Sequence, residues 1–247
     1  MDITEAMGID IGGSGIKGAP ADVVQGRLTG PRLRVSTPDP STPDNVVEAV
    51  VQLVADHNWS GPVGVTIPGV VLNGTVATAA NIDDAWIGFD ARERFSQALG
   101  LPTAILNDAD AAGLAEARFG GDASGVVILL TFGTGIGSAV IQDGKLVPNT
   151  ELGHLEFHGG KAETYAAARL VKRESMRIDW WAERVNEYLA YIETLFSPDR
   201  IIIGGGISKR FDEFSPYLST RCAVQPARLR NNAGIVGAAL YATEETR

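Results

Sequence analysis

Two glycine-rich turns, each expected to follow an apolar strand, are the segments of this sequence best suited to hold phosphate. Residues 10–17 read DIGGSGIK, and residues 131–138 read TFGTGIGS. Backbone N–H groups in such turns point at phosphate oxygens, and Lys17 adds a point charge to the first turn. Asp10 offers an oxygen ligand to Mg²⁺, usually through a water molecule. For one turn taken alone, a plain hairpin with a surface lysine is an equal alternative.

The second turn differs from two common nucleotide-binding motifs. No Gly-Lys-Ser/Thr follows it at the spacing of a Walker loop, and a strand follows it where a dinucleotide fingerprint needs a helix. Two such turns at matching positions of two halves nevertheless favour a role in phosphate binding.

A carboxylate suited to general-base catalysis comes at residue 108, where an expected strand gives way to an expected helix. A hydroxyl group is a poor nucleophile, and a positioned carboxylate such as Asp108 can accept its proton in a group-transfer reaction. Asn107 supplies both a donor and an acceptor for a second hydroxyl. The alternative is that Asp108 caps the helix, and the two roles are compatible.

The elements that must position these residues alternate along both halves of the chain. Apolar runs predict the main strands at residues 7–11, 63–67, 103–106, 126–132 and 200–203. Apolar spacing and helix-start signals predict helices at residues 43–54, 91–99, 109–119, 183–196 and 233–244. Asp143 and Gly144 form a hairpin-turn signal. Because each half opens with strand, glycine turn and strand, we expect two duplicated α/β lobes with a central cleft.

The composition limits the class of protein. The 247 residues suffice for two modest lobes, and 45% hydrophobic with 21% charged residues is ordinary for a globular enzyme. Cys222 is the single cysteine, so an internal disulfide and a cysteine-rich zinc site are excluded. No apolar run reaches the length of a membrane span, and the acidic residues 1–5 are unlike a secretory signal. We therefore expect a cytoplasmic protein.

The net charge of −9 argues against general binding to nucleic acid or to an acidic membrane. An anionic substrate must then be held by local positive charge or by backbone dipoles. The 29 glycines suit backbone cradles of that kind.

Five segments of this sequence occur in the order found in the ROK sugar kinases. They are residues 10–17, 106–109, 131–138, 151–154 and 203–206. Three longer stretches resemble one branch of that family, the polyphosphate glucokinases: residues 130–139, 147–156 and 229–237. The similarity covers residues 7–240, and blocks of this length and order are far more specific than any single glycine turn.

The resemblance implies an actin-like/hexokinase (ribonuclease H-like) fold. Residues 1–115 and the C-terminal helix, about 233–247, would form one lobe, and residues 116–232 the other. It implies a kinase that forms glucose 6-phosphate, with Asp108 as the base and Mg²⁺ as a cofactor. The sugar ligands implied are Asn107, Asp108, Glu151, His154 and Glu163, with Gly69 and Asn81 lining the pocket. The donor ligands implied are Asp10, Gly12, Gly13, Ser14, Gly15, Lys17, Thr131, Gly133, Thr134, Gly135, Gly205, Gly206 and Lys209.

The segment after His154 departs from the family that this sequence resembles. Many members of the wider family carry a cysteine-rich zinc motif there. This chain has LEFHGGKA at residues 155–162, so we expect no zinc site. Glu151, His154 and His158 taken alone would also read as metal ligands, but no second cluster of such residues supports that interpretation.

The branch resemblance implies inorganic polyphosphate as the donor, alone or together with ATP. A polyphosphate chain needs positive groups beyond those that hold one triphosphate, and candidates are Lys17, Lys172, Arg173, Lys209, Arg210, Arg228 and Arg230. The alternative is that the paired basic residues form solvated helix faces, and the sequence does not place them in one groove.

Other classes of function remain to be weighed against this one. Within the family, an ATP-dependent glucokinase or a gluco/mannokinase is the alternative. A sugar-sensing regulatory protein would need a DNA-binding module ahead of the first strand, for which residues 1–6 leave no room. An actin-like filament or chaperone ATPase would lack the pair Glu151 and His154. Related sugar kinases are often dimers, and Trp180 with Trp181 marks either core or a homodimer contact.

Overall fold

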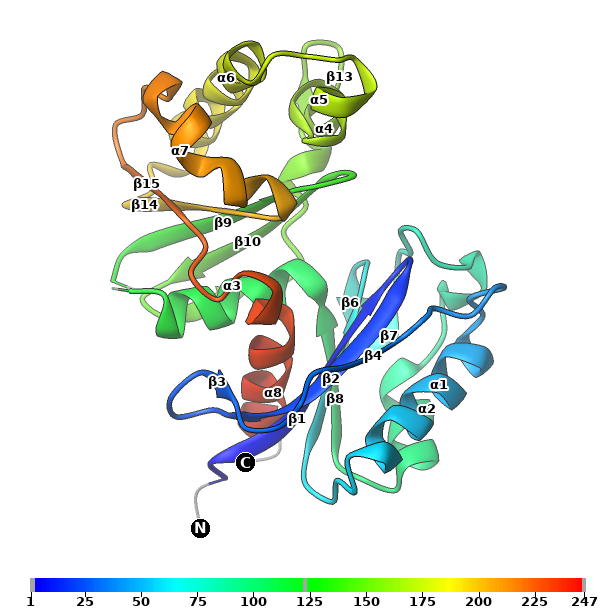
Figure 1. The fold of residues 1–247 in the computed structure, drawn as a ribbon. Helices are drawn as coiled ribbons and strands as arrows, with labels where there is room; N and C mark the ends of the chain where they lie inside the picture. Colours follow the sequence, from blue (N-terminus) through cyan, green and yellow to red (C-terminus); the bar gives the residue numbers. More distant parts are fainter. Residues whose placement is uncertain (1–2, 122–123, 246–247) are drawn as a thin grey trace. The chain divides into compact units, whose positions relative to one another are not determined.

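The computed structural model describes residues 3–121 and 124–245 and divides the chain into two compact units. Unit 1 comprises Met1–Ala115 and Asn232–Arg247, and unit 2 comprises Glu116–Asn231. Each unit is built on one mixed sheet with helices beside it (Figure 1). The two units are described in turn.

The sheet of unit 1 combines an antiparallel hairpin with parallel strands. Its order is β3 (Arg27–Leu28), β2 (Gly15–Asp22), β1 (Glu5–Gly12), β5 (Val63–Ile67) and β8 (Thr103–Asn107), with β4 (Leu33–Val35) also paired to β2. Strand β1 runs antiparallel to β2 and parallel to β5, which in turn runs parallel to β8. The carboxyl ends of β1, β5 and β8 therefore meet at one edge of the sheet.

Helices cover both faces of this sheet. Helices α1 (Pro43–Asp56) and α2 (Ala91–Leu99) lie on one face, and α8 (Ala233–Glu245) lies on the other (Figure 1). Met7 and Ile9 of β1 pack in one apolar cluster with Val50 and Leu53 of α1. The Val-rich spacing that predicts α1 thus corresponds to its buried side, as expected for an amphipathic helix.

Helix α8 approaches the sheet of unit 1 backbone to backbone. A Cβ atom added to Gly8 of β1 or to Gly64 of β5 would lie 1.8 Å from the carbonyl oxygen of Ile235 or of Ala238. Real Cβ atoms do not approach oxygen so closely, so only glycine permits this packing. The last helix of unit 1 is therefore seated by glycines from its first half.

Smaller elements complete unit 1. They are β6 (Val71–Leu72), β7 (Thr75–Val76) and the 3₁₀ helix η1 (Asp84–Trp86). Helix α3 (Asp108–Phe119) follows β8 without a break, and its last turn belongs to unit 2.

The sheet of unit 2 repeats the pattern of the first. Its order is β11 (Lys145–Val147), β10 (Ile136–Gln142), β9 (Val126–Phe132), β14 (Arg200–Gly204) and β15 (Ala223–Pro226). Strand β9 is antiparallel to β10 and parallel to β14, which is parallel to β15. Asp143 and Gly144 both adopt positive φ, 50° and 78°, in the turn between β10 and β11, as the hairpin signal predicts. The predicted duplication of α/β lobes is confirmed.

Helix α6 (Ile178–Phe196) provides much of the core of unit 2. The sequence-based prediction that it begins at residue 183 is wrong, because the helix starts five residues earlier. Trp181 is fully buried, packs edge-on against Phe132 and donates from Nε1 to the carbonyl of Ala166 at 2.9 Å. Its neighbour Trp180 is 58% exposed. One tryptophan of the pair is therefore core and the other is surface.

Short elements fill the connections of unit 2. They are η2 (Leu152–His154), β12 (Glu156–Phe157), β13 (Gly160–Lys161), α4 (Ala162–Ala166), α5 (Arg169–Arg173), η3 (Gly206–Arg210), α7 (Phe211–Phe214), η4 (Ser215–Tyr217) and η5 (Arg230–Asn232). Among the described residues, none of the helices has the length and apolar character needed to cross a membrane.

The close approach of α8 generates a stability prediction. Gly64→Ala forces β5 and α8 apart, and we expect it to lower the free energy of unfolding by about 1–3 kcal/mol, the usual cost of overpacking. Gly206→Ala is the control, because its Cβ would meet no atom within 4 Å. Thermal unfolding followed by circular dichroism measures both variants. Equal melting temperatures for Gly64→Ala and the wild type would contradict the packing described.

Candidate functional site

The predicted residues of unit 1 gather at the edge where its parallel strands end. The first glycine turn follows β1, Gly69 follows β5, and Asn107 ends β8. Ligand sites of α/β sheets commonly lie beyond the carboxyl ends of parallel strands. The strand order thus brings segments separated by almost a hundred residues to one edge.

Asn107 organises the start of helix α3. It is buried, and its Oδ1 accepts from the backbone N–H groups of Ala109 at 2.8 Å and Asp110 at 3.0 Å. Its Nδ2 donates to the carbonyl of Gly69 at 3.0 Å. Asn107 therefore caps the helix, a role that the sequence had offered to Asp108, and ties the loop after β5 to the loop after β8.

Asp108 is exposed at the first position of α3. Its Oδ1 accepts from the N–H of Ala109 at 2.9 Å. The positive end of the helix dipole favours a negative charge at this position. An exposed, oriented carboxylate can accept a proton from a bound hydroxyl.

Asp10 and Lys17 face each other across the first hairpin. They are register partners in β1 and β2, and Lys17 Nζ lies 3.0 Å from Asp10 Oδ2. Thr66 of β5 donates to the other carboxylate oxygen at 3.4 Å. Gly234, near the start of α8, approaches the same carboxylate, since its Cβ would lie 3.5 Å from it. The predicted magnesium ligand and the predicted phosphate ligand thus neutralise each other.

Arg34 is a cation of this edge that the sequence analysis missed. It is the register partner of Lys17 on β4, and its Nη2 donates to the carbonyl of Ser14 at 2.8 Å. A Cβ at Gly15 would lie 2.6 Å from this guanidinium, and one at Gly13 would lie 2.7 Å from the carbonyl oxygen of Asn81. The glycine turn is therefore held between Arg34 and Asn81. Alternation along β4 with the register of β2 was the signal that could have identified Arg34.

The predicted donor residues of unit 2 gather at the corresponding edge of its sheet. The second glycine turn follows β9, and Gly204 of the parallel strand β14 pairs with Thr131. Gly205 has φ 79°, and its Cβ would lie 2.3 Å from the carbonyl oxygen of Phe132. The turn after β14 therefore packs against the turn after β9. The predicted donor residues that lie in these two turns and in η3 are Thr131, Gly133, Thr134, Gly135, Gly205, Gly206 and Lys209.

Glu151, His154 and Glu163 come together beside the second glycine turn. His154 Nδ1 lies 3.5 Å from Glu151 Oε2, and a Cβ at Gly135 would lie 2.4 Å from Glu163 Oε2. Burial raises the pKa of Glu151, and Glu163 raises it further, whereas His154 and Lys161 lower it. The three groups expected to bind a sugar thus form one cluster of two carboxylates and an imidazole.

His158 turns to a different part of unit 2. Its Nε2 lies 2.9 Å from Glu187, and its ring stacks on Tyr165 with centroids 4.5 Å apart. Within residues 3–121 and 124–245, no group of three or more His, Cys, Asp or Glu side chains has the arrangement of a metal site. The metal interpretation of Glu151, His154 and His158 is therefore not supported by their positions.

The basic candidates for a polyphosphate track separate into paired and unpaired groups. Arg173 pairs with Glu174 at 2.8 Å, and Arg210 pairs with Glu213 at 2.7 Å, so both belong to solvated ion pairs. Lys209, Arg228 and Arg230 instead line one pocket in unit 2. The structure thereby groups three of the seven candidates, a grouping that their sequence positions did not reveal.

Two solved structures share the fold of this chain. The crystal structure of an inorganic polyphosphate/ATP-glucomannokinase from Arthrobacter sp. strain KM has a TM-score of 0.92 and 48% identity, covering 98% of this chain and 100% of that one. A ROK glucokinase from Streptomyces griseus, in complex with glucose and AMPPNP, has a TM-score of 0.83 and 26% identity, covering 97% and 99%. These neighbours confirm the predicted actin-like/hexokinase architecture.

Sequence comparison gives the same assignment. A polyphosphate glucokinase from Mycobacterium tuberculosis is 50% identical over 242 residues, which cover 97% of this chain and 91% of the relative. The sequence model of the ROK family matches residues 6–174. This range includes both glycine turns, Asp108 and the pair Glu151 and His154. The chain belongs to the ROK family.

Proposed function

We propose that this protein is a polyphosphate glucokinase, an enzyme that transfers a phosphoryl group from inorganic polyphosphate to glucose and forms glucose 6-phosphate. The observation that carries the proposal is the 50% identity to the mycobacterial polyphosphate glucokinase across nearly the whole chain. The proposal is supported by the oriented carboxylate of Asp108, by the cluster of Glu151, His154 and Glu163, and by the two glycine turns. The two units are proposed to be the two lobes of this kinase.

In the proposed reaction Asp108 is the general base. The carboxylate takes the proton of the sugar 6-hydroxyl as its oxygen bonds to the terminal phosphorus, while the bond between that phosphorus and the bridging oxygen breaks. The donor leaves as a chain shortened by one phosphate. The cap formed by Asn107 fixes the direction of Asp108, because Asn107 holds the first turn of the helix that Asp108 begins.

Sugar binding is assigned to predicted ligands from unit 2 and from unit 1. Glu151, His154 and Glu163 supply acceptors and a donor for hydroxyl pairs. On unit 1, the second N–H of the Asn107 amide is assigned to a sugar hydroxyl, and Gly69 and Asn81 are assigned to the lining of the same pocket. Paired hydrogen bonds of this kind discriminate among sugars because an absent hydroxyl leaves a buried polar group without a partner.

Asp10 is the proposed ligand of Mg²⁺. A single, partly exposed carboxylate fits this ion, which keeps several of its waters. When bound, the ion neutralises charge on the donor phosphates. Lys17 pairs with Asp10 in this structure. When the donor binds, its phosphate replaces Asp10 as the partner of Lys17. The backbone of Gly12, Gly13, Ser14 and Gly15 completes the cradle on unit 1.

A second donor and a second acceptor are favoured by one observation. The Arthrobacter neighbour, 48% identical, is described as using polyphosphate or ATP and as a glucomannokinase. We therefore include ATP as an alternative donor and mannose as an alternative acceptor for this chain.

The experiment that tests the function is product formation by the purified protein with Mg²⁺. Glucose 6-phosphate is measured with polyphosphate and with ATP as separate donors, and we expect turnover on polyphosphate. Product from ATP alone would show that ATP is the donor instead of polyphosphate, and the assignment as a glucose kinase would stand. An absence of product from both donors would overturn the proposal.

The role of Asp108 predicts a specific loss. Asp108→Asn keeps the shape and removes the base, so we expect kcat to fall by about 10²–10⁴-fold, the usual range for general-base catalysis. Glucose affinity, measured by calorimetry, should change little. Asp56→Asn, at an exposed aspartate ending α1, is the matched control and should keep full turnover. Near-normal kcat in Asp108→Asn would rule out this base.

The raised pKa of Glu151 predicts a pH dependence of glucose binding. Burial raises the pKa above the ordinary 4.5, so Glu151 takes up its proton at a higher pH than an exposed glutamate does. A protonated Glu151 accepts hydroxyl protons poorly, so the Kd for glucose should rise as the pH falls through this raised pKa. For Glu151→Gln we expect a larger Kd for glucose and no acid limb, meaning no further rise of that Kd as the pH falls. Calorimetric titrations from neutral pH downwards compare the two, and an unchanged acid limb in the variant would assign it to another group.

A homodimer is proposed from the surface of unit 2. Trp180 is 58% exposed and Tyr217 is 51% exposed, and the guanidinium of Arg177 lies 5.7 Å from the centre of the Trp180 ring. Exposed aromatic residues with arginine are typical of interfaces. We expect sedimentation equilibrium to give a dimer and Trp180→Ala to weaken it. A monomeric wild type at micromolar concentration would contradict this.

A cytoplasmic location is proposed from cysteine usage. The chain has one cysteine, Cys222, and burial together with the neighbouring Glu193 carboxylate raises the pKa of its thiol to about 11. Such a thiol reacts slowly, and the fold needs no oxidising compartment. Cell fractionation with an antibody against the protein tests the assignment.

A further inference from the structure

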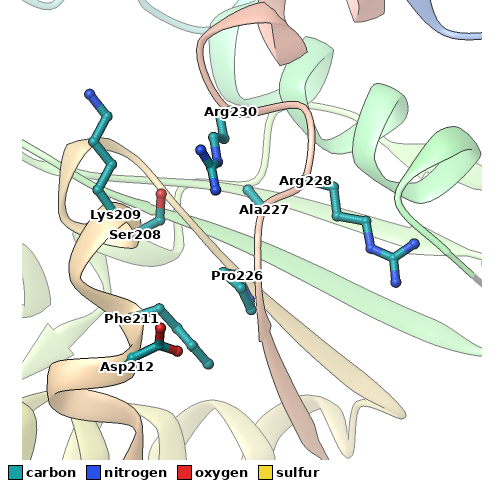
Figure 2. Close-up of a pocket in the computed structure, with 8 residues that line it drawn as sticks. All are labelled: Ser208, Lys209, Phe211, Asp212, Pro226, Ala227, Arg228 and Arg230. Atoms are coloured by element: carbon teal, nitrogen blue, oxygen red, sulfur yellow. The ribbon is translucent and has the colours of Figure 1, made fainter.

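A pocket in unit 2 lies next to the proposed donor turn. It has a volume of about 390 Å³ and opens between the segment η3–α7 and the chain that leaves β15 (Figure 2). Its lining residues are Ser208, Lys209, Phe211, Asp212, Pro226, Ala227, Arg228 and Arg230. Ser208 stands two residues after Gly206, so the pocket continues directly from the glycine turn that follows β14.

The pocket carries local positive charge in an acidic protein. Its lining has Lys209, Arg228 and Arg230 against one carboxylate, Asp212, whereas the whole chain has a net charge of −9. Among the described residues, neither Lys209 nor Arg230 forms an ion pair, although Arg210 in the same segment pairs with Glu213. In Figure 2, Arg230 extends into the space between the two segments, Lys209 stands at the rim, and Arg228 points away from Arg230. Two cations are therefore available to an anion.

A buried carboxylate holds the segment that presents Arg230. Glu116, on the last turn of α3, is 1% exposed and accepts from the backbone N–H groups of Arg228 at 2.9 Å and Leu229 at 2.7 Å. A buried carboxylate is stable only with such partners. Glu116 thus fixes the two backbone N–H groups that directly precede Arg230.

Two local features show how closely this segment is defined. Arg230 has φ 51°, in the left-handed region that a non-glycine residue rarely adopts. A Cβ at Gly120 would lie 2.7 Å from Glu116 Oε2, so glycine leaves the room that the carboxylate occupies. The direction of the Arg230 side chain therefore depends on the anchoring of its backbone by Glu116.

We propose that this pocket binds a phosphate group of the inorganic polyphosphate donor through Arg230 and Lys209, and that Glu116 is the positioning residue that holds Arg230 in place. The proposal rests on the proposed function, since it names the subsite into which the donor chain continues beyond the glycine turns. A guanidinium binds phosphate oxygens in pairs, and an ammonium adds a point charge at the rim. A neutral nucleoside would leave both cations without an anion, so the chemistry favours inorganic phosphate.

The first test compares Arg230→Gln with Arg210→Gln. Both variants remove one positive charge from the same part of unit 2, but Arg210 is already paired with Glu213. We expect Arg230→Gln to raise the KM for polyphosphate by about tenfold, as the loss of one charge-assisted pair does, while kcat and the KM for glucose stay unchanged. Arg210→Gln should leave all three values unchanged. Equal effects of the two variants would reduce the role of Arg230 to general charge and overturn the proposal.

A binding measurement separates this proposal from the proposed function. Calorimetry with inorganic tripolyphosphate, without glucose, should give a weaker Kd for Arg230→Gln than for the wild type. If the wild type transfers phosphate and Arg230→Gln binds and reacts normally, the pocket proposal fails and the kinase stands. If no donor gives product but tripolyphosphate binding still depends on Arg230, the pocket stands and the proposed function fails. A loss confined to ATP would assign the pocket to a nucleotide and overturn the proposal.

Glu116→Gln tests the positioning role. The amide keeps the size of the side chain but turns one acceptor into a donor that faces backbone N–H groups. We expect the KM for polyphosphate to rise as in Arg230→Gln, with an unchanged KM for glucose. Thermal unfolding is measured in parallel, because a purely structural defect would lower the melting temperature. A lower melting temperature without a change in the KM for polyphosphate would contradict the positioning role.

Discussion

The parallel pairing of β1 with β5 and of β5 with β8 is the constraint on which the first half of the site depends. Parallel strands send their carboxyl ends to the same edge, so the turn after β1, the loop after β5 and the start of α3 have no other place to meet. The pairing of β9 with β14 does the same for the second half. Each sheet thus supplies an edge where backbone N–H groups and a few side chains are concentrated.

Asn107 shows how the sequence turns that constraint into a reactive geometry. One short amide caps α3 through Oδ1 and holds the loop of Gly69 through Nδ2, which leaves Asp108 exposed and oriented. An aspartate in place of Asn107 would keep the cap and lose the donor. The proposed base and its support are therefore adjacent in sequence, and the buried residue orients the exposed one.

Much of the fold follows from local signals. Buried runs of Val and Ile predict β5, β9 and β14, and the spacing of valines predicts α1, because one apolar face must be covered in each case. The early start of α6 was missed because the burial of Trp181 depends on Phe132, a residue distant in the sequence. Local pattern gives little information about such packing. The Asp143–Gly144 turn, by contrast, was predictable because both of its residues favour positive φ.

The candidate residues can be named from the sequence, but their contacts cannot. The sequence indicated Asp10, Asp108 and the Glu151–His154 pair by residue type and order. Arg34 and Glu116 were not predicted from the sequence. Arg34 depends on the register of two strands, and Glu116 depends on a contact with a distant loop. The sequence also could not tell an ion-paired Arg210 from an unpaired Arg230. Arg210 is paired because Glu213 lies one helical turn away. The position of Arg230 depends on the backbone conformation between β15 and α8.

The seating of α8 on Gly8 and Gly64 has a consequence for how the molecule is made. Synthesis proceeds from the N-terminus, so the strands of unit 1 emerge first, then all of unit 2, and only afterwards the helix that covers one face of the first sheet. Until then that face has no partner of its own. Contacts between such distant segments form slowly, and transiently uncovered apolar surface invites aggregation. The nascent chain therefore passes through a stage in which its second half can fold while one face of its first sheet is still uncovered.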